Sequence, residues 1–194
     1  MPAGGTGLVL RGLRKEPATI GKWHLGWDLT YKEGKAKTVD NIDFTKRVAN
    51  GPTDRGFDYF YGLTSPSGPP HLYMVNDMAE KQPNTRFEES GGGLYKIKGG
   101  IGHSDWSADG MQPHLADKML EYLDENKDSD KPFFLYMALT APHIPLFPSK
   151  EFKGKSKIGD YGDLVMMIDD IVGRVNRKLK EIGKYDNTIV MFDA

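Results

Sequence analysis

The chain has 194 residues, of which 26 are Lys or Arg, 27 are Asp or Glu and none is Cys, and its formal net charge is −1. This length predicts one domain that can bury a core without disulfides or a structural metal. The balanced charge disfavours a nucleic-acid binder, the lack of Cys excludes disulfides and a thiol nucleophile, and no apolar run approaches the roughly 18 residues of a membrane span.

Apolar patterns predict an alternating series of strands and helices. Pro113 suits the start of a helix whose apolar stripe includes Leu115, Met119 and Leu123, and Gly183 suits the end of a second helix. Continuous apolar runs of strand length are typical of strands buried on both faces. The predicted elements are a strand at 17–21, a helix from 113, a strand at 132–139, a long helix at 161–181 and a buried strand at 187–192.

This order of elements predicts an α/β fold with a mostly parallel sheet flanked by helices. The regular part covers residues 113–194. Residues 31–112 are loop-rich, contain many Tyr and Phe residues and show no sustained periodicity. We therefore expect short elements there, joined by long loops that form a binding surface on the substrate side.

Two candidate functional segments follow predicted strands. Lys22 and His24 come after the strand at 17–21, and in an extended chain their side chains point to one face while Trp23 points to the other. His143 follows the strand at 132–139 and lies between two prolines, which restrict its loop. Because open α/β sheets bind ligands at the carboxyl ends of their strands, we expect these residues to border one site.

A lysine and two histidines that face one cavity suit an oxyanion ester. The ammonium group attracts the anion as a point charge, and the imidazoles donate hydrogen bonds or a proton. Each residue also has an ordinary alternative, since a Lys-x-His pair is often solvated and a His between prolines can cap a turn. On the residues alone, sulfate esters and phosphate esters both fit the predicted site.

Five segments in order carry a resemblance to a known family. Residues 19–26, TIGKWHLG, are similar to a signature of the sulfatases. The other four segments are GFDYFYG at 56–62, KPFFLY at 131–136, TAPHIP at 140–145 and DNTIVMF at 186–192. On these segments, residues 1–194 resemble the middle portion of an arylsulfatase catalytic domain.

The resemblance implies an alkaline phosphatase-like fold and hydrolysis of sulfuric esters of carbohydrates or aryl alcohols. It implies that Lys22 binds the sulfate group and the nucleophile, that His24 hydrogen-bonds the nucleophile, and that His143 contacts the sulfate and assists the leaving alcohol. Family members use a formylglycine nucleophile and a calcium ion with oxygen ligands. The implied partner is a sulfated small molecule or glycan, without nucleic acid or membrane, and the family suggests a periplasmic, secreted or lysosomal setting.

The sequence departs from the family pattern at the nucleophile and at the metal ligands. Formylglycine is made from a Cys or Ser in a Cys/Ser-x-Pro-x-Arg motif, and this motif is absent. The family's amino-terminal Asp pair is also missing, and its Asp-Asn pair would follow Ala194, so we name no metal ligand. We expect a partial catalytic domain without turnover on its own, which associates through an exposed sheet edge. Alternatives are a phosphodiesterase or phosphonate hydrolase of the same superfamily, and a non-catalytic anion-binding protein.

The loop-rich region contains further candidate residues. His71 follows the aromatic segment at 57–61 and is a candidate substrate-binding residue. His103, Asp105 and Trp106 lie in a glycine-rich loop, where contact with a sugar and a structural role fit equally well.

Overall fold

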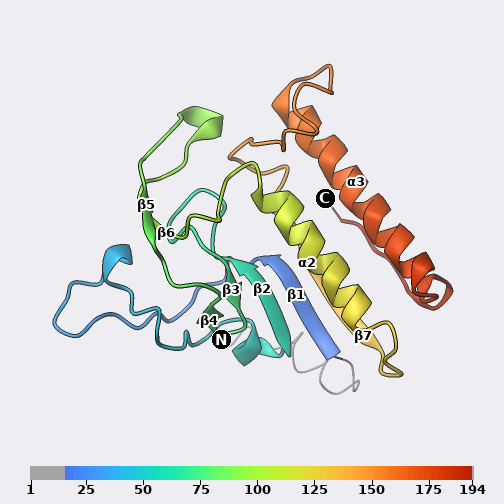
Figure 1. Cartoon of the computed structure of the whole chain (residues 1–194), viewed down its shortest axis with the longest axis horizontal. Coiled ribbons are helices and arrows are strands. Elements are labelled where there is room, and N and C mark those ends of the chain that lie inside the picture. Colours follow the sequence, from blue (N-terminus) through green and yellow to red (C-terminus); the bar gives the residue numbers. More distant parts are fainter. Residues whose placement is uncertain (1–15, 194) are drawn as a thin grey trace.

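The computed structural model describes residues 16–193, which form a five-stranded sheet, a two-stranded sheet and two long helices (Figure 1). The strands are β1 Glu16–Lys22, β2 Tyr59–Leu63, β3 Met74–Val75, β4 Met78–Ala79, β5 Thr85–Phe87, β6 Gly100–Gly102 and β7 Phe133–Ala138. The larger sheet has the order β4-β3-β2-β1-β7, and β1 pairs in parallel with both β2 and β7. Antiparallel β3 and β4 extend this sheet, and β5 pairs with β6 in the smaller one.

The two helices cover one face of the larger sheet. They are α2 Met111–Glu125 and α3 Asp160–Glu181, and four short 3-10 helices are η1 Val39–Asn41, η2 Thr53–Arg55, η3 Gly93–Tyr95 and η4 Tyr185–Asn187. Figure 1 shows α2 across β1 and β2, with α3 beside α2. The predicted α/β fold and both predicted helices are confirmed. No helix within the described residues is long and apolar enough to cross a membrane.

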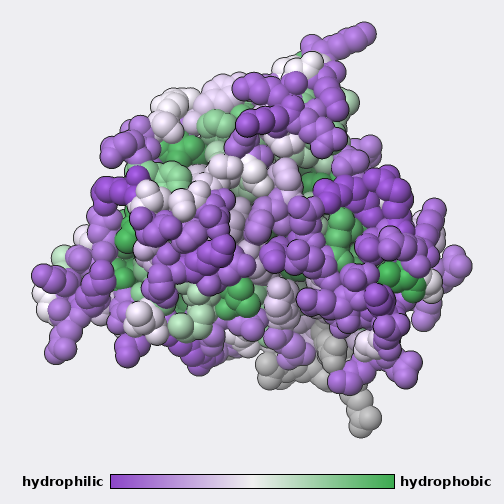
Figure 2. Space-filling view, viewed as in Figure 1, coloured by the Kyte–Doolittle hydropathy of each residue, from purple (hydrophilic) through white to green (hydrophobic). Residues whose placement is uncertain are grey.

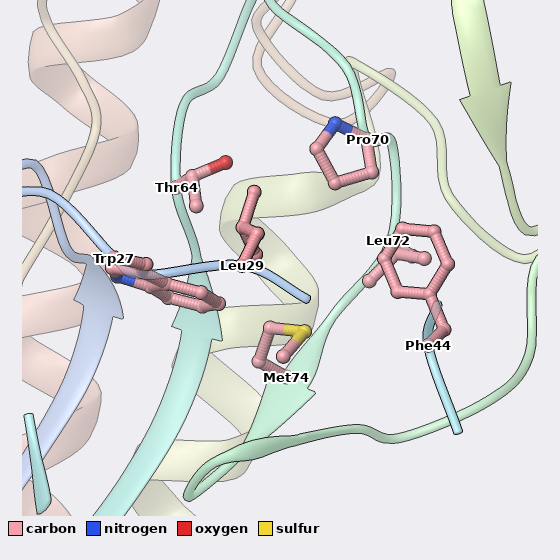
Figure 3. Close-up of a pocket in the computed structure, with 7 residues that line it drawn as sticks. All are labelled: Trp27, Leu29, Phe44, Thr64, Pro70, Leu72 and Met74. Carbon is pink, nitrogen blue, oxygen red and sulfur yellow. The ribbon is translucent and has the colours of Figure 1, made fainter. Parts of the chain in front are cut away.

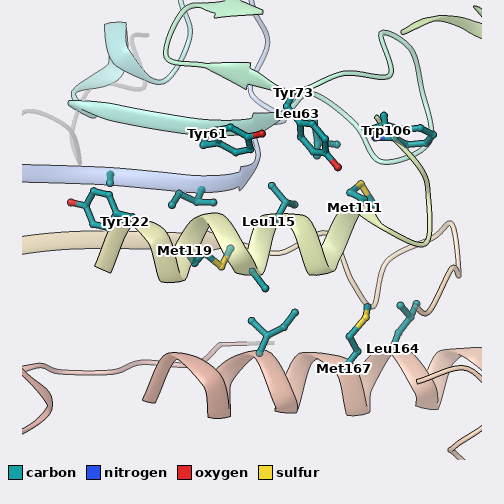
Figure 4. Packing of buried hydrophobic residues seen from close by; sticks show 14 of the residues in the cluster. Tyr61, Leu63, Tyr73, Trp106, Met111, Leu115, Met119, Tyr122, Leu164 and Met167 are labelled. Carbon is teal, nitrogen blue, oxygen red and sulfur yellow. The ribbon is translucent and has the colours of Figure 1, made fainter. Parts of the chain in front are cut away.

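The main core lies between the sheet and the helices (Figure 4). Alternation along β1 turns Ala18 and Ile20 toward α2, and both are fully buried. The helical spacing of Leu115 and Met119 places both on the inner face of α2, where each is 0% exposed. Met167 of α3 packs against the same cluster. The apolar stripes read from the sequence therefore account for this core.

A second core covers the opposite face of the sheet. It is formed mainly by side chains of the loop-rich region, namely Trp23, Ile42, Phe44, Val48, Phe60, Leu72 and Met74. Phe60 of β2 is 0% exposed and faces this side, whereas Tyr61 faces α2. The short elements and long loops predicted for residues 31–112 are confirmed, and aromatic packing holds them against the sheet.

The predicted buried strand at 187–192 is wrong. After η4 this segment has no β-ladder, and Ile189 and Met191 are 87% and 83% exposed. An extended segment becomes a strand only where a neighbouring strand accepts its backbone hydrogen bonds, and none of the described strands pairs with it.

The predicted strand at 132–139 is confirmed as β7, but it is not buried on both faces. β7 is the outer strand of the sheet among the described strands, and Tyr136 is 53% exposed. The run of apolar residues indicated a strand correctly. Burial on both faces requires side chains packed above and below the sheet. Phe133, Leu135 and Met137 pack against the clusters on the helix side, whereas Tyr136 on the other face is left exposed.

Candidate functional site

Lys22 is the last residue of β1, which lies between β2 and β7. In the parallel register it is opposite Leu63 of β2. The residue before it, Gly21, is opposite Gly62 of β2 and Ala138 of β7. The three strands therefore end at one edge of the sheet, and the loops leaving this edge carry the predicted site residues. Open parallel sheets bind ligands at this edge.

Two glycines allow the strand backbones to approach closely beneath Lys22. A Cβ atom on Gly62 would lie 1.8 Å from the carbonyl oxygen of Gly21, and one on Gly21 would lie 2.0 Å from that of Ala138. Gly21 also has a φ of +132°, which L side chains rarely adopt. Because neither position has room for a side chain, the end of β1 depends on glycine at both.

Lys22 is a partly buried cation for which residues 16–193 provide no counter-ion. Within residues 16–193 its Nζ atom forms no ion pair and no side-chain hydrogen bond. Burial lowers the pKa of the Lys22 ammonium group, because removal of water disfavours the charged form. By contrast, Arg47 and Arg86 in the loop-rich region are both paired with carboxylates. A bound anion would compensate the desolvation of Lys22, so this position is suited to anion binding.

Trp23 anchors the chain directly after Lys22. It is 7% exposed, its indole Nε1 donates to the Gly26 carbonyl oxygen at 3.2 Å, and its ring meets Phe57 edge-on at 6.3 Å. Its predicted inward packing is confirmed, because Trp23 belongs to the second core. That Lys22 points to the opposite face stays a prediction. His24 is exposed and lies beyond the end of β1. That His24 and Lys22 share a face stays a prediction.

His143 lies exposed on the loop that follows β7. Its Nδ1 atom is 2.6 Å from the carbonyl oxygen of Ile144. Because a carbonyl oxygen only accepts hydrogen bonds, Nδ1 carries the proton, and Nε2 of the neutral ring is left able to accept one. The loop is attached to α2 through Thr140, whose backbone N–H donates to Oε1 of buried Gln112 at 3.3 Å.

His71 does not reach a surface that a substrate could contact, which corrects its prediction as a substrate-binding residue. It is 1% exposed, and its ring packs on Trp106 and Phe87 at 4.5 and 5.1 Å. Its Nε2 atom donates to the Lys98 carbonyl oxygen at 2.7 Å, and Nδ1 is buried without a partner. Burial lowers the pKa of His71, since a second ring proton would have no acceptor. His71 therefore has a structural role, in which it holds together the segments that carry Phe87, Lys98 and Trp106.

Sequence analysis left two roles possible for His103, Asp105 and Trp106, contact with a sugar or a structural role. Trp106 has a structural role. It is 4% exposed and belongs to the main core. His103 is mostly buried and lies 3.2 Å from the Asn84 amide and 3.5 Å from the Asp105 carboxylate. These contacts hold the turn after β6 together.

Asp163 has a positioning role that sequence reasoning missed. It is 0% exposed, and its carboxylate accepts hydrogen bonds from the backbone N–H groups of Gly154 and Ser156, both at 2.6 Å. It thereby fastens the loop before α3 to the first turn of that helix. The sequence signal was only a carboxylate near a helix start, which ordinarily indicates interaction with the helix dipole.

A partly buried polar cluster joins β2, α2 and the chain after β4, and the sequence did not reveal it. The Tyr61 hydroxyl donates to the Glu80 carboxylate at 2.7 Å and lies 2.6 Å from His114 Nε2. Because the only hydroxyl proton goes to Glu80, the hydroxyl accepts from the Nε2–H of His114. Burial raises the pKa of Tyr61 and lowers that of His114, so both are held neutral. The cluster joins α2 to the loop-rich region.

An apolar crevice beside β2 and β3 is not the substrate site (Figure 3). Its volume is about 10 Å³, which holds at most one water molecule. It belongs to the packing of the second core, and its walls are formed by Trp27, Leu29, Phe44, Thr64, Pro70, Leu72 and Met74.

Comparison with protein families gives one match that covers nearly the whole chain. The family model described as Sulfatase matches residues 9–194. The chain is 30% identical over 190 residues to N-acetylgalactosamine-6-sulfatase of Sus scrofa, covering 96% of this chain and 31% of that protein. It is also 30% identical to the uncharacterized sulfatase YdeN of Escherichia coli, covering 91% and 30%. The chain thus spans about three tenths of the length of these relatives.

Solved structures share the fold. A structure from work on glycosaminoglycan metabolism by Bacteroides thetaiotaomicron superposes with a TM-score of 0.73 at 21% identity, covering 94% of this chain and 43% of that one. The PsFucS1 sulfatase from Pseudoalteromonas sp. gives a TM-score of 0.61 at 22% identity, covering 92% and 34%. At these identities the likeness concerns the arrangement of sheet and helices.

Proposed function

The chain belongs to the sulfatase family, and we propose that Lys22, His24 and His143 form the part of its site that binds a sulfate ester. The proposed reaction of the whole protein is hydrolysis, in which water and a sulfuric ester give an alcohol and sulfate. One observation carries the proposal. The partly buried ammonium group of Lys22, at the carboxyl end of β1, has no ion-pair partner among residues 16–193.

Each of the three residues has a proposed role that its placement supports. Lys22 attracts the sulfate oxygens as a point charge, in a position where partial burial strengthens the attraction. His143 contacts the sulfate and, when protonated at Nε2, gives that proton to the leaving oxygen. His24 hydrogen-bonds the nucleophile, for which its exposure directly after β1 leaves room.

We propose a sulfated carbohydrate as the substrate. The support is the name of several relatives, N-acetylgalactosamine-6-sulfatase, at about 30% identity. Because the chain covers about three tenths of these proteins, the substrate and the activity are proposals for the protein to which this region contributes.

Membership of the sulfatase family implies a metal cofactor, and we propose that the ion is calcium. The residues described here do not fit such an ion, because within residues 16–193 no group of three or more His, Asp or Glu side chains is placed to hold a metal. The oxygen ligands that calcium prefers would have to come from other segments. We therefore assign no step to the ion.

Hydrolysis of a phosphodiester or phosphonate is the second candidate function. The Lys22 ammonium group is a compact point charge, without a planar set of hydrogen-bond donors matched to one oxyanion. Its chemistry alone therefore suits both sulfate and phosphate groups. The relatives named above favour sulfate.

The proposal is tested by titrating the chain with sodium sulfate and with sodium phosphate at constant ionic strength while its melting temperature is recorded. Binding to the folded state raises the melting temperature by mass action. We expect sulfate to raise it in the parent chain and in Lys37→Met, an exposed lysine in the loop-rich region, but not in Lys22→Met. Equal stabilisation of both variants would contradict the site, and stabilisation by phosphate alone would favour the second function.

A further inference from the structure

Residues 90–98, here called the strap, form a closed loop between β5 and β6. Ser90 and Ile97 exchange two backbone hydrogen bonds of 3.0 and 2.9 Å at its base. Gly91 has a φ of +67°, and a Cβ atom there would lie 2.2 Å from the Tyr95 carbonyl oxygen. Ile97 is 5% exposed in the main core, so the base of the strap is fixed while its tip is exposed.

The strap is bonded to the loops on both sides of the Lys22 strand. On the β2 side, the Lys98 N–H donates to the Ser67 carbonyl oxygen at 2.9 Å. On the β7 side, the Leu146 N–H donates to the Leu94 carbonyl oxygen at 2.8 Å, three residues after His143. Because β1 lies between β2 and β7, the strap connects the loops that follow the two neighbours of the Lys22 strand.

Figure 1 agrees with this placement. The green loop between β5 and β6 extends to the same side of the molecule as the first turns of α2 and α3 and the carboxyl ends of β1 and β2. The hydrophobic areas of the face in Figure 2 are small and separated by hydrophilic atoms. This face therefore shows no broad apolar surface.

Tyr95 at the tip of the strap is exposed but held in place. Its ring meets Phe147 edge-on at 6.1 Å, and the Asp160 carboxylate beside its hydroxyl raises the pKa of that hydroxyl. The residue is nevertheless 40% exposed. An aromatic ring that is already immobilised loses little conformational entropy when a ligand packs on it. The neighbouring Lys96 and Asp160 can hydrogen-bond ligand hydroxyl groups.

We propose that Tyr95 is a specificity-determining residue that binds the sugar ring of the substrate, while Lys22 binds its sulfate group. This inference rests on the proposed function. A pyranose ring offers an apolar C–H face for the tyrosine ring and hydroxyl groups for the polar side chains beside it. The assignment replaces Trp106, whose burial in the main core removes it from contact with a sugar.

The test compares N-acetylgalactosamine 6-sulfate with inorganic sulfate, with both dissociation constants measured by calorimetry on the full chain. We expect Tyr95→Ala to weaken binding of the sulfated sugar by about tenfold and to leave binding of inorganic sulfate unchanged. Tyr95→Phe keeps the ring. The change in the logarithm of its dissociation constant for the sulfated sugar should be less than half of the change in Tyr95→Ala. Tyr185→Ala, a similarly exposed tyrosine after α3, is the control and should change neither constant.

Two outcomes separate this inference from the proposed function. If inorganic sulfate binds and Tyr95→Ala binds the sulfated sugar as tightly as the parent chain, the role of Tyr95 is overturned and the anion site stands. If the parent chain binds neither ligand, both the anion site and the role of Tyr95 are overturned. Circular dichroism of each variant establishes that it is folded.

Discussion

The α2–β7–α3 part of the molecule and the loop-rich region bury their side chains in different ways. In the first, single stripes along α2 and α3 meet a sheet, and residues such as Leu115 and Ile171 are almost fully buried. In the second, aromatic rings pack on the other sheet face, and isolated bridges and exposed ion pairs such as Arg86–Asp40 connect the loops.

This difference explains how the candidate site is assembled. The regular part fixes the positions of strand ends, and therefore of Lys22 and the loop of His143. The loop-rich region contributes the strap, whose conformation depends on contacts between residues far apart in sequence. In the proposed site, the sheet edge supplies the anion-binding residues, and the loops supply the surroundings that distinguish one ester from another.

The largest effect is expected from Gly62→Val, which tests whether the two regions share one folding unit. A Cβ atom at this position would lie 1.8 Å from the Gly21 carbonyl oxygen, so β1 and β2 must separate. We expect a loss of about 3 kcal/mol or more in the free energy of unfolding, measured by urea denaturation.

Gly51→Ala is the control for this prediction, because a Cβ atom on Gly51 meets no atom within 4 Å. The aromatic signal, which reports on both cores, and the far-ultraviolet signal should shift together in Gly62→Val. A loop-rich region that kept its parent stability would show that the two regions unfold separately.

A smaller effect is expected from Tyr61→Phe, which removes one polar contact between the regions. The hydroxyl connects Glu80, after β4, to His114 of α2, and Tyr61 is 1% exposed. Loss of a buried hydroxyl that serves two partners should cost about 2 kcal/mol. In a double-mutant cycle with Glu80→Gln the two losses should be less than additive, and full additivity would show that the hydrogen bond contributes nothing.

The pH dependence of stability gives the smallest predicted effect and concerns the loop-rich region. Burial lowers the pKa of His71 below its ordinary value of 6.5, so the unfolded chain binds more protons than the folded chain once the pH falls below that value. The free energy of unfolding should therefore decrease as the pH is lowered from about 7 to 5. His71→Gln should reduce this slope, and a slope identical to that of the parent chain would contradict the buried, neutral state of His71.

Local sequence patterns predicted those helices and strands in which buried residues recur at regular spacing. The stripes of α2 and α3 and the apolar run of β7 are such patterns, and each element formed near its predicted bounds. The segment at 187–192 has the same kind of pattern, but a strand also needs a partner, and no local pattern contains that information. Lys22 was found because a cation that follows a strand lies at the sheet edge in any parallel arrangement.

The residues that sequence reasoning misplaced or missed depend on contacts across long separations. His71 is buried because Phe87, Lys98 and Trp106 close around it. Tyr95 lies beside the loop of His143 through its ring contact with Phe147 and a backbone hydrogen bond between Leu94 and Leu146. Spacing and composition do not encode such contacts, so a histidine that serves the core and one that serves a site look alike in the sequence.

The central claim is that the carboxyl end of β1 holds an anion site built on Lys22. Nuclear magnetic resonance of the full chain during a titration with sodium sulfate, at constant ionic strength and pH, tests it most directly. The account predicts saturable shifts of the Lys22 side-chain signals and of the His143 ring, with the buried His71 ring unchanged as an internal control. Signals of Lys22 that do not move, or that drift without saturation like those of exposed Lys37, would contradict it.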